Sequence, residues 1–298
     1  LSVLSILALQ QHGIPHPKAT YLIETCEESG SFDLPAYLDE LSDTLGTPDL
    51  VVVMDSGAGD YERLWVTTSL RGLVGGTLKV GVCEEGVHSG MAGGIIPSSF
   101  RIARSIISRI EDESTGQVLL PELSVDISDE LHGEAQGIAD VLGEKVWTDL
   151  PALDGVEPQT LGLKEIVLSG NWRPSLSVTG VDGMPSLKNA GNVLRTHTSF
   201  KLSMRIPPGV DADVAEGAMC SALEANPPHG AHVSFTADAA ANGFAAPPMD
   251  SDFREALNKA SLATFGNPMQ VFFEGGTIPF LAMMQEKYPN ANFLVTGS

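Results

Sequence analysis

The sequence predicts an α/β protein whose mixed sheet has helices on both faces and is interrupted by an inserted α+β domain. Two short apolar runs rich in β-branched residues, 19–25 and 49–55, are predicted as buried strands. Between them a helix is predicted over 34–46, with Asp33 as its N-cap and Gly46 as its C-terminal stop. A strand, a helix and a second strand at this spacing form a βαβ unit, the building block of an α/β sheet.

The middle of the chain has a different pattern. Strands predicted at 75–90, 198–209 and 230–238 alternate apolar and polar residues, and amphipathic helices are predicted at 98–113 and 212–226. Alternating strands are typical of an antiparallel sheet with one solvated face. We therefore expect an α+β domain that is distinct from the first part.

The last part of the chain returns to the α/β pattern. Its predicted elements are helices at 251–264 and 279–287 and strands at 269–273 and 291–296. The predicted division is an α/β domain over 1–71 and 241–298, with the inserted domain over 72–240. The chain begins without methionine inside a stretch that is typical of the second half of a helix ending at Gly13, so we expect both of its ends to be truncated.

The composition excludes several classes of function. The 298 residues include 38 acidic and 17 basic side chains, and the resulting net charge of −21 repels nucleic-acid phosphates and anionic membranes. No apolar run approaches the ~20 residues that a membrane-spanning helix needs. Cys26, Cys83 and Cys220 are far apart and form no Cys-x-x-Cys pair, which favours neither a disulfide framework nor a cysteine zinc site. We expect a cytoplasmic protein without nucleic-acid or membrane partners.

A pair of glutamates follows the first predicted strand. Glu27 and Glu28 lie in ETCEESGS, at a carboxyl strand end, where side chains of an open α/β sheet face the ligand crevice. Beside a cation, one carboxylate can bind the metal while the other takes a proton from a metal-held water. Asp55 ends the second predicted strand and can approach the same site. The ordinary alternatives are two solvated loop glutamates, and a cap or Asx-turn for Asp55.

Five motifs in order resemble those of the di-zinc aminoacylase, carnosinase and succinyl-diaminopimelate desuccinylase family of metallopeptidases. They are ETCEESGS (24–31), the strand end at Asp55, GVHSGMAGG (86–94), KLSMRIPPG (201–209) with Asn192 shortly before it, and EGGTIPF (274–280). Their order along the chain supports the resemblance more than any single motif does.

The resemblance implies roles for the residues of the first three motifs. Glu27 would be the general base, and Glu28 and Asp55 would be metal ligands. His88 would reach the active site of a partner subunit and hydrogen-bond the oxygen of the reacting carbonyl. Taken alone, a histidine in a glycine-rich loop such as His88 is more often structural or solvent-exposed.

The last two motifs are implied to bind substrate. Arg205 would hold the terminal carboxylate, because a planar guanidinium matches a carboxylate with two hydrogen bonds. Asn192, Thr277 and Gly276 would line the same pocket. Without the resemblance, Arg205 suits a solvated strand face, and the Gly-Gly turn suits a tight turn before a helix that starts with proline.

The resemblance also implies a fold and an activity. The fold would be a zinc-peptidase catalytic domain interrupted by a ferredoxin-like lid and dimerisation domain, through which a homodimer forms. The enzyme would use a metal-activated water to cleave the amide bond of a dipeptide, with two zinc ions, although cobalt or manganese also suit such ligands. Two alternatives stay open: an N-acyl amino acid deacylase or desuccinylase, and a catalytically incomplete dimerising protein of the same fold.

The sequence departs from the family at the metal site. In the family a His-x-Asp motif and a bridging Asp precede the Glu-Glu pair, and a His lies near the C-terminus; this sequence contains none of these. Only Glu28 and Asp55 remain of the direct ligands, whereas a catalytic zinc usually has three protein ligands. We therefore expect this chain alone to bind zinc weakly, if at all, and to have little or no hydrolase activity.

Overall fold

The computed structural model describes residues 2–297, apart from the side chain of Glu28. Contacts within the chain divide it into two compact units, Leu1–Pro48 and Asp49–Ser298. The described elements of the first unit are α1 (Ser2–Gln11), the 3-10 helix η1 (Glu27–Ser29), α2 (Leu34–Glu40) and α3 (Ser42–Leu45).

The first unit confirms the predicted helices but not the predicted strand. Gly13 and Gly46 take positive φ angles of 65° after α1 and α3, as expected of helix stops. The helix predicted over 34–46 is divided at Leu41 into α2 and α3, and the side chain of Asp33 makes no capping hydrogen bond. The predicted strand at 19–25 is wrong, because these residues have no strand partner within the described part of this unit.

The second unit contains a four-stranded antiparallel sheet in the order β5-β7-β3-β8. Its strands are β3 (Gly72–Gly81), β5 (Ser175–Asp182), β7 (His197–Ile206) and β8 (His232–Ala241). The central pair, β3 and β7, stays in register over ten residues, from Gly72↔Ile206 to Gly81↔His197. The predicted alternating strands are confirmed in β7 and in β3, although the strand predicted over 75–90 already ends at Gly81.

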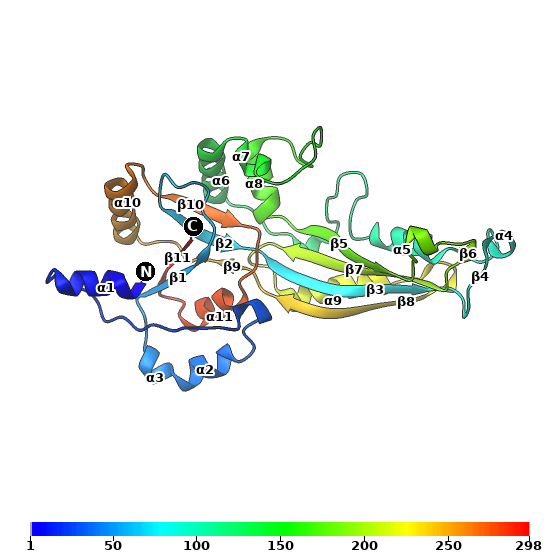
Figure 1. The fold of residues 1–298 in the computed structure, drawn as a ribbon, viewed down its shortest axis with the longest axis horizontal. Coiled ribbons are helices and arrows are strands. Elements are labelled where there is room, and N and C mark those ends of the chain that lie inside the picture. The colour runs from blue at the N-terminus through cyan, green and yellow to red at the C-terminus, as the bar shows by residue number, and fades with distance from the viewer. Residues whose placement is uncertain (1, 298) are drawn as a thin grey trace. The chain divides into compact units, whose positions relative to one another are not determined.

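Two helices, α5 (Ser99–Ile107) and α9 (Ala212–Glu224), cover one face of this sheet (Figure 1). The apolar residues of alternate strand positions, such as Leu78 and Leu202, pack against Ile106 and Met219 in one core. The opposite face carries polar and charged side chains and is not covered by these two helices. The sheet thus separates an apolar core from a polar surface, as an antiparallel sheet commonly does.

The remaining strands of the second unit form smaller sheets. β1 (Leu50–Ser56) pairs in parallel with β11 (Asn292–Gly297), and β2 (Trp65–Leu70) lies between β10 (Gln270–Glu274) and β9 (Phe244–Ala245). A short antiparallel pair, β4 (Val87–His88) and β6 (Val193–Leu194), lies beyond one end of the long strands, with α4 (Ser89–Ala92) beside it (Figure 1). The strands predicted at 49–55, 269–273 and 291–296 are confirmed as β1, β10 and β11.

Helices pack on these smaller sheets and enclose two further cores. They are α6 (Asp129–Leu142), α7 (Lys145–Thr148), α8 (Leu163–Asn171), α10 (Ser251–Phe265) and α11 (Pro279–Lys287). Short 3-10 helices are η2 (Pro121–Leu123), η3 (Leu187–Asn189) and η4 (Pro228–Gly230). The helices predicted at 251–264 and 279–287 are confirmed as α10 and α11, whereas α6 and α8 were not predicted. Ser128 accepts a hydrogen bond from the backbone of Leu131 at the start of α6, a capping signal that the sequence contains.

The close packing of β3 against β8 generates a stability prediction. A methyl group on the buried Gly76 would lie 2.4 Å from the ring atom Cζ of Phe235 and 2.9 Å from the carbonyl oxygen of Thr236. We expect Gly76→Ala to lower the free energy of unfolding by about 1–3 kcal/mol, because the core has no room to accommodate it. Chemical denaturation monitored by circular dichroism measures the change.

Gly133 provides the matched control. It lies exposed in α6, and nothing lies within 4 Å of an added methyl group. Gly133→Ala should raise the free energy of unfolding by about 0.5–1 kcal/mol through helix propensity. Equal effects of the two alanines would contradict this account of the sheet.

Candidate functional site

Arg205 and Thr277 meet at one end of the four-stranded sheet. Arg205 is the second-last residue of β7, and Thr277 lies in the turn between β10 and α11. Nη1 of Arg205 donates a hydrogen bond to Oγ1 of Thr277 over 2.6 Å. Oγ1 of Thr277 in turn donates to the carbonyl oxygen of Arg71 over 2.7 Å. Two predicted substrate-binding residues that are 72 positions apart are therefore brought into direct contact.

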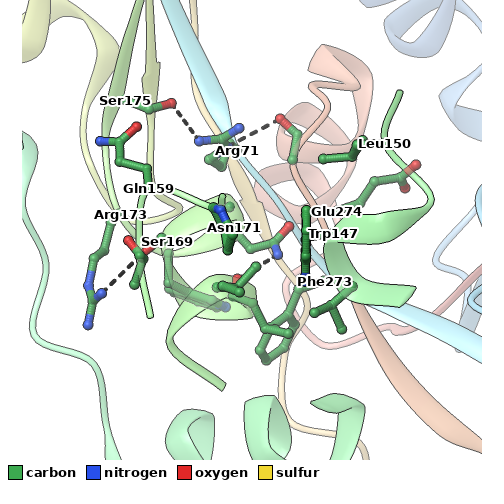
Figure 2. Close-up of a pocket in the computed structure, with 18 of the residues that line it drawn as sticks. Arg71, Trp147, Leu150, Gln159, Ser169, Asn171, Arg173, Ser175, Phe273 and Glu274 are labelled. Atoms are coloured by element: carbon green, nitrogen blue, oxygen red, sulfur yellow. Dashed lines mark hydrogen bonds between the residues drawn. The ribbon is translucent and has the colours of Figure 1, made fainter. Parts of the chain in front are cut away.

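Arg71, which the sequence did not indicate, lies beside this pair. It is the residue between β2 and β3, and its guanidinium donates from Nη1 to Oγ of Ser175 (2.9 Å) and from Nε to the carbonyl oxygen of Gly275 (3.3 Å) (Figure 2). Burial and, second to it, the nearby charge of Arg205 lower the pKa of Arg71 to about 10. A single charged residue in the apolar run SLRGLVGG was the signal that the sequence contained.

A cavity of about 1310 Å³ opens beside Arg71. Its wall combines apolar side chains, such as Trp147, Leu150 and Phe273, with polar ones, such as Asn171 and Arg173 (Figure 2). A concave surface of this mixed character is typical of a small-molecule site. A ligand of the size of a peptide therefore fits into this cavity, next to the cationic side chain of Arg71.

Glu274 lies on the wall of the same cavity and is held by hydroxyl groups. Its Oε2 accepts a hydrogen bond from Oγ of Ser56 over 2.8 Å, and Ser56 also contacts the hydroxyl of Thr67. These bonds hold the Glu274 side chain to β1 and β2. The turn that carries Gly276 and Thr277 is thus held at two points, by the bond of Glu274 to Ser56 and by the bond of Thr277 to the backbone of Arg71.

His88 and Asn192 lie together, but at the other end of the sheet. Val193 pairs with His88, and the backbone nitrogen of Ser89 donates to the carbonyl oxygen of Asn192 over 2.9 Å. Both side chains are exposed, and Nδ1 of His88 accepts from the backbone of Gly90. Because β3 is ten residues long, about 30 Å of strand separates them from Arg205. Within one chain, His88 and Asn192 therefore do not join the site of Arg205 and Thr277 (Figure 1).

The predicted metal-site residues belong to different units. Glu27, in the first unit, is half-buried at the start of η1, and the side chain of Glu28 lies outside the described part of the structure. Asp55, in the second unit, is exposed near the end of β1. The convergence of Glu28 with Asp55 stays a prediction.

The donor set falls short of the needs of a metal ion. Among the described residues, no group of three or more His, Cys, Asp or Glu side chains is placed to hold a metal. A catalytic zinc usually has three protein ligands. The described residues therefore do not fit a metal centre by themselves.

Comparison with known proteins identifies the family. Residues 68–231 match the family model of the peptidase dimerisation domain. This segment contains β3, β5 and β7 of the four-stranded sheet and both of the helices that cover it. The chain belongs to this M20 peptidase family. The matched segment carries both Arg205 and His88.

Individual M20 relatives cover most of the chain. It is 27% identical to the cysteinylglycine-S-conjugate dipeptidase of Corynebacterium striatum over 97% of this chain and 62% of that protein. It is 25% identical to the Cys-Gly metallodipeptidase of Saccharomyces cerevisiae over 88% of this chain and 55% of the relative. The chain therefore spans less than two thirds of the length of these curated relatives.

A solved structure shows the same fold. The crystal structure of human carnosine dipeptidase 1 aligns with a TM-score of 0.73 and 20% identity, over 99% of this chain and 63% of the other. The predicted α/β fold with an inserted domain is confirmed at this level. No described helix is long and apolar enough to span a membrane.

The incomplete donor set generates a prediction about zinc. Because two carboxylates do not surround a zinc ion, we expect the 298-residue chain to bind Zn²⁺ weakly, with little change in Asp55→Asn. Isothermal titration calorimetry with zinc chloride checks this. Tight binding of two ions per chain would contradict it.

Proposed function

We propose that the protein to which this chain belongs is a metal-dependent hydrolase that cleaves the amide bond of dipeptides or related substrates with a free carboxylate. The contact between Arg205 and Thr277 carries the proposal, because it fixes a guanidinium next to Arg71, and Arg71 lines a cavity of peptide size. The names of the relatives from Corynebacterium striatum and Saccharomyces cerevisiae, both dipeptidases, support the substrate class.

Each residue of the proposed substrate-binding site has a distinct role. Arg205 binds the substrate carboxylate with two charge-assisted hydrogen bonds. The hydroxyl of Thr277 holds the guanidinium in place, and the exposed backbone of Gly276 leaves room for the substrate. Glu27 is proposed as the general base, on the strength of its motif.

The metal of the proposed enzyme is zinc, because carboxylate and histidine ligands suit it, although cobalt and manganese suit them as well. Glu28 and Asp55 are the proposed ligands from this chain. Since they are fewer than three, further donors have to come from outside the described residues. The three cysteines are free, which supports a reducing, cytoplasmic location.

A homodimer through the inserted domain resolves the separation of the predicted site residues. His88 and Asn192 lie about 30 Å of strand away from Arg205 in the same chain. In a symmetric dimer, the end of one sheet reaches the other subunit, so His88 of one copy meets Arg205 of the second. The match to a dimerisation domain supports this arrangement.

A second candidate is a dimerising protein of the same fold without catalysis. The absence of a three-donor group from the described residues favours it. An N-acyl amino acid deacylase or desuccinylase is the remaining enzymatic alternative. Substrate assays separate the three cases.

We expect the full-length protein with zinc to hydrolyse dipeptides and to discriminate against their C-terminal amides, which lack the charge that Arg205 binds. Assays with dipeptides, dipeptide amides, N-acetyl and N-succinyl amino acids measure this, with a chelator as the control. Preferred cleavage of acylated amino acids would indicate the deacylase. No hydrolysis of any substrate would indicate the non-catalytic protein.

The dimer proposal predicts complementation between inactive variants. His88→Ala and Arg205→Ala should each be nearly inactive, but mixed and refolded together they should recover about a quarter of the activity, because one site of each hybrid dimer is intact. Mixing His88→Ala with Asn192→Ala is the matched control. These two residues lie at the same end of the sheet, so no hybrid site is intact and no recovery is expected.

A further inference from the structure

Two arginines lie together in the second unit without a carboxylate partner. The charge of Arg205 is near enough to lower the pKa of Arg71. Thr277 links the two residues, because its hydroxyl accepts a hydrogen bond from the Arg205 guanidinium and donates one to the backbone carbonyl of Arg71. Among the described residues, no Asp or Glu lies within ion-pair distance of either guanidinium. Their side-chain hydrogen bonds end instead on neutral groups.

In the part of the chain that the structure describes, carboxylates pair with other arginines, but not with these two. Acidic residues outnumber basic ones by 38 to 17, so counter-ions are plentiful. Arg63, Arg173 and Arg254 each form an ion pair with a carboxylate. Burying a charge without a partner is costly, and two like charges side by side add to that cost. A bound anion would remove both costs.

The backbone places both guanidinium groups on the same face of the sheet. Arg205 pairs with Leu73 across β7 and β3, and Arg71 precedes Leu73 by two residues. Side chains two positions apart in an extended strand point to the same side. Ser175, which holds the Arg71 guanidinium, is the partner of Arg205 on the other neighbouring strand.

The guanidinium of Arg71 retains donors for a ligand. Of its five N–H groups, one binds Ser175 and one binds the carbonyl of Gly275, which leaves three. The side chain lines the cavity, so these donors border the space in which a ligand fits (Figure 2). The two fixed hydrogen bonds hold the guanidinium in place before a ligand arrives, which lowers the cost of binding.

We propose that Arg71 is a second carboxylate-binding residue, which shares the terminal carboxylate of the substrate with Arg205. The inference rests on the proposed function, in which Arg205 alone holds this group. A peptide with a free α-carboxylate satisfies both cations, whereas a C-terminal amide leaves both of them without a counter-ion. Arg71 therefore contributes to the selection of free acids over amides.

The test measures binding without catalysis. Dipeptide analogues in which a CH₂–NH unit replaces the amide are titrated calorimetrically into the full-length zinc-loaded protein, as the free acid and as the C-terminal amide. Arg71→Gln should reduce the preference for the free acid about 10-fold or more, the effect of losing a charge-assisted hydrogen bond. A purely structural role would weaken the binding of both analogues equally.

Arg173→Gln is the matched control. Arg173 lines the same cavity, but its charge is paired with Glu165 at 2.6 Å. This variant should retain the wild-type preference for the free acid. If Arg71→Gln does not fold, Arg71→Lys replaces it in the test. Lysine keeps the charge but lacks the planar guanidinium, so this variant should show an intermediate preference for the free acid.

The outcomes separate this inference from the proposed function. An Arg71→Gln protein that folds and keeps the full preference, while Arg205→Gln loses it, overturns the role of Arg71. That role is equally overturned if Arg71→Gln does not fold and Arg71→Lys keeps the full preference. A third outcome is that the preference for the free acid depends on Arg71 but the wild-type protein hydrolyses no peptide. This outcome supports the carboxylate-binding site and refutes the proposed hydrolase.

Discussion

The register between β3 and β7 is the constraint on which the arrangement of the site depends. Ten paired residues set the length of the central strands and place Arg205 at one end and the chain leading to His88 at the other. The register is fixed by burial, because a slip by one residue would turn Leu78 and Leu202 out of the core. The same hydrophobic packing that stabilises the sheet therefore determines which polar groups can meet within one chain.

The long-range charge of the protein and the local charge of the site have opposite signs. A net charge of −21 repels an anionic substrate at a distance, although salt screens this repulsion beyond about 10 Å. As proposed, Arg71 and Arg205 would act on the substrate carboxylate at contact distance and in a partly buried place, where the effective dielectric constant is lower and Coulombic attraction is stronger. In the proposed function, discrimination at this site would therefore depend on contact, with little contribution from electrostatic steering.

The sequence predicted the helices of the first unit but not its lack of a strand at 19–25, and it predicted part of the second unit. Periodicity identified β7, α9, β8 and every element from 251 onwards, because each buries one face against a core. The run at 19–25 has the composition of a strand, but strand formation depends on a partner that local sequence does not reveal. Gly133 and Gly137 weakened the helical pattern of α6, which packing against α8 and β10 compensates.

The candidate site was predicted in part, and for a similar reason. The motifs indicated Arg205 and Thr277, and their contact in the structure supports the grouping. Arg71 and Ser175 carry no motif, since their relation to Arg205 arises only from strand pairing. Glu28 and Asp55 belong to separate units, so their proximity depends on an arrangement that neither spacing nor local packing determines.

The parallel pairing of β1 with β11 has a consequence for biosynthesis. Residues 50–53 pair with 292–295, so the strand that is made first waits for nearly the whole unit to be translated before its partner exists. Until then β1 exposes a row of unsatisfied backbone groups along an apolar run, which is the kind of edge that associates with other chains. At the usual pace of translation of about 5–20 residues per second, this interval lasts tens of seconds, and throughout it β1 lacks its parallel partner.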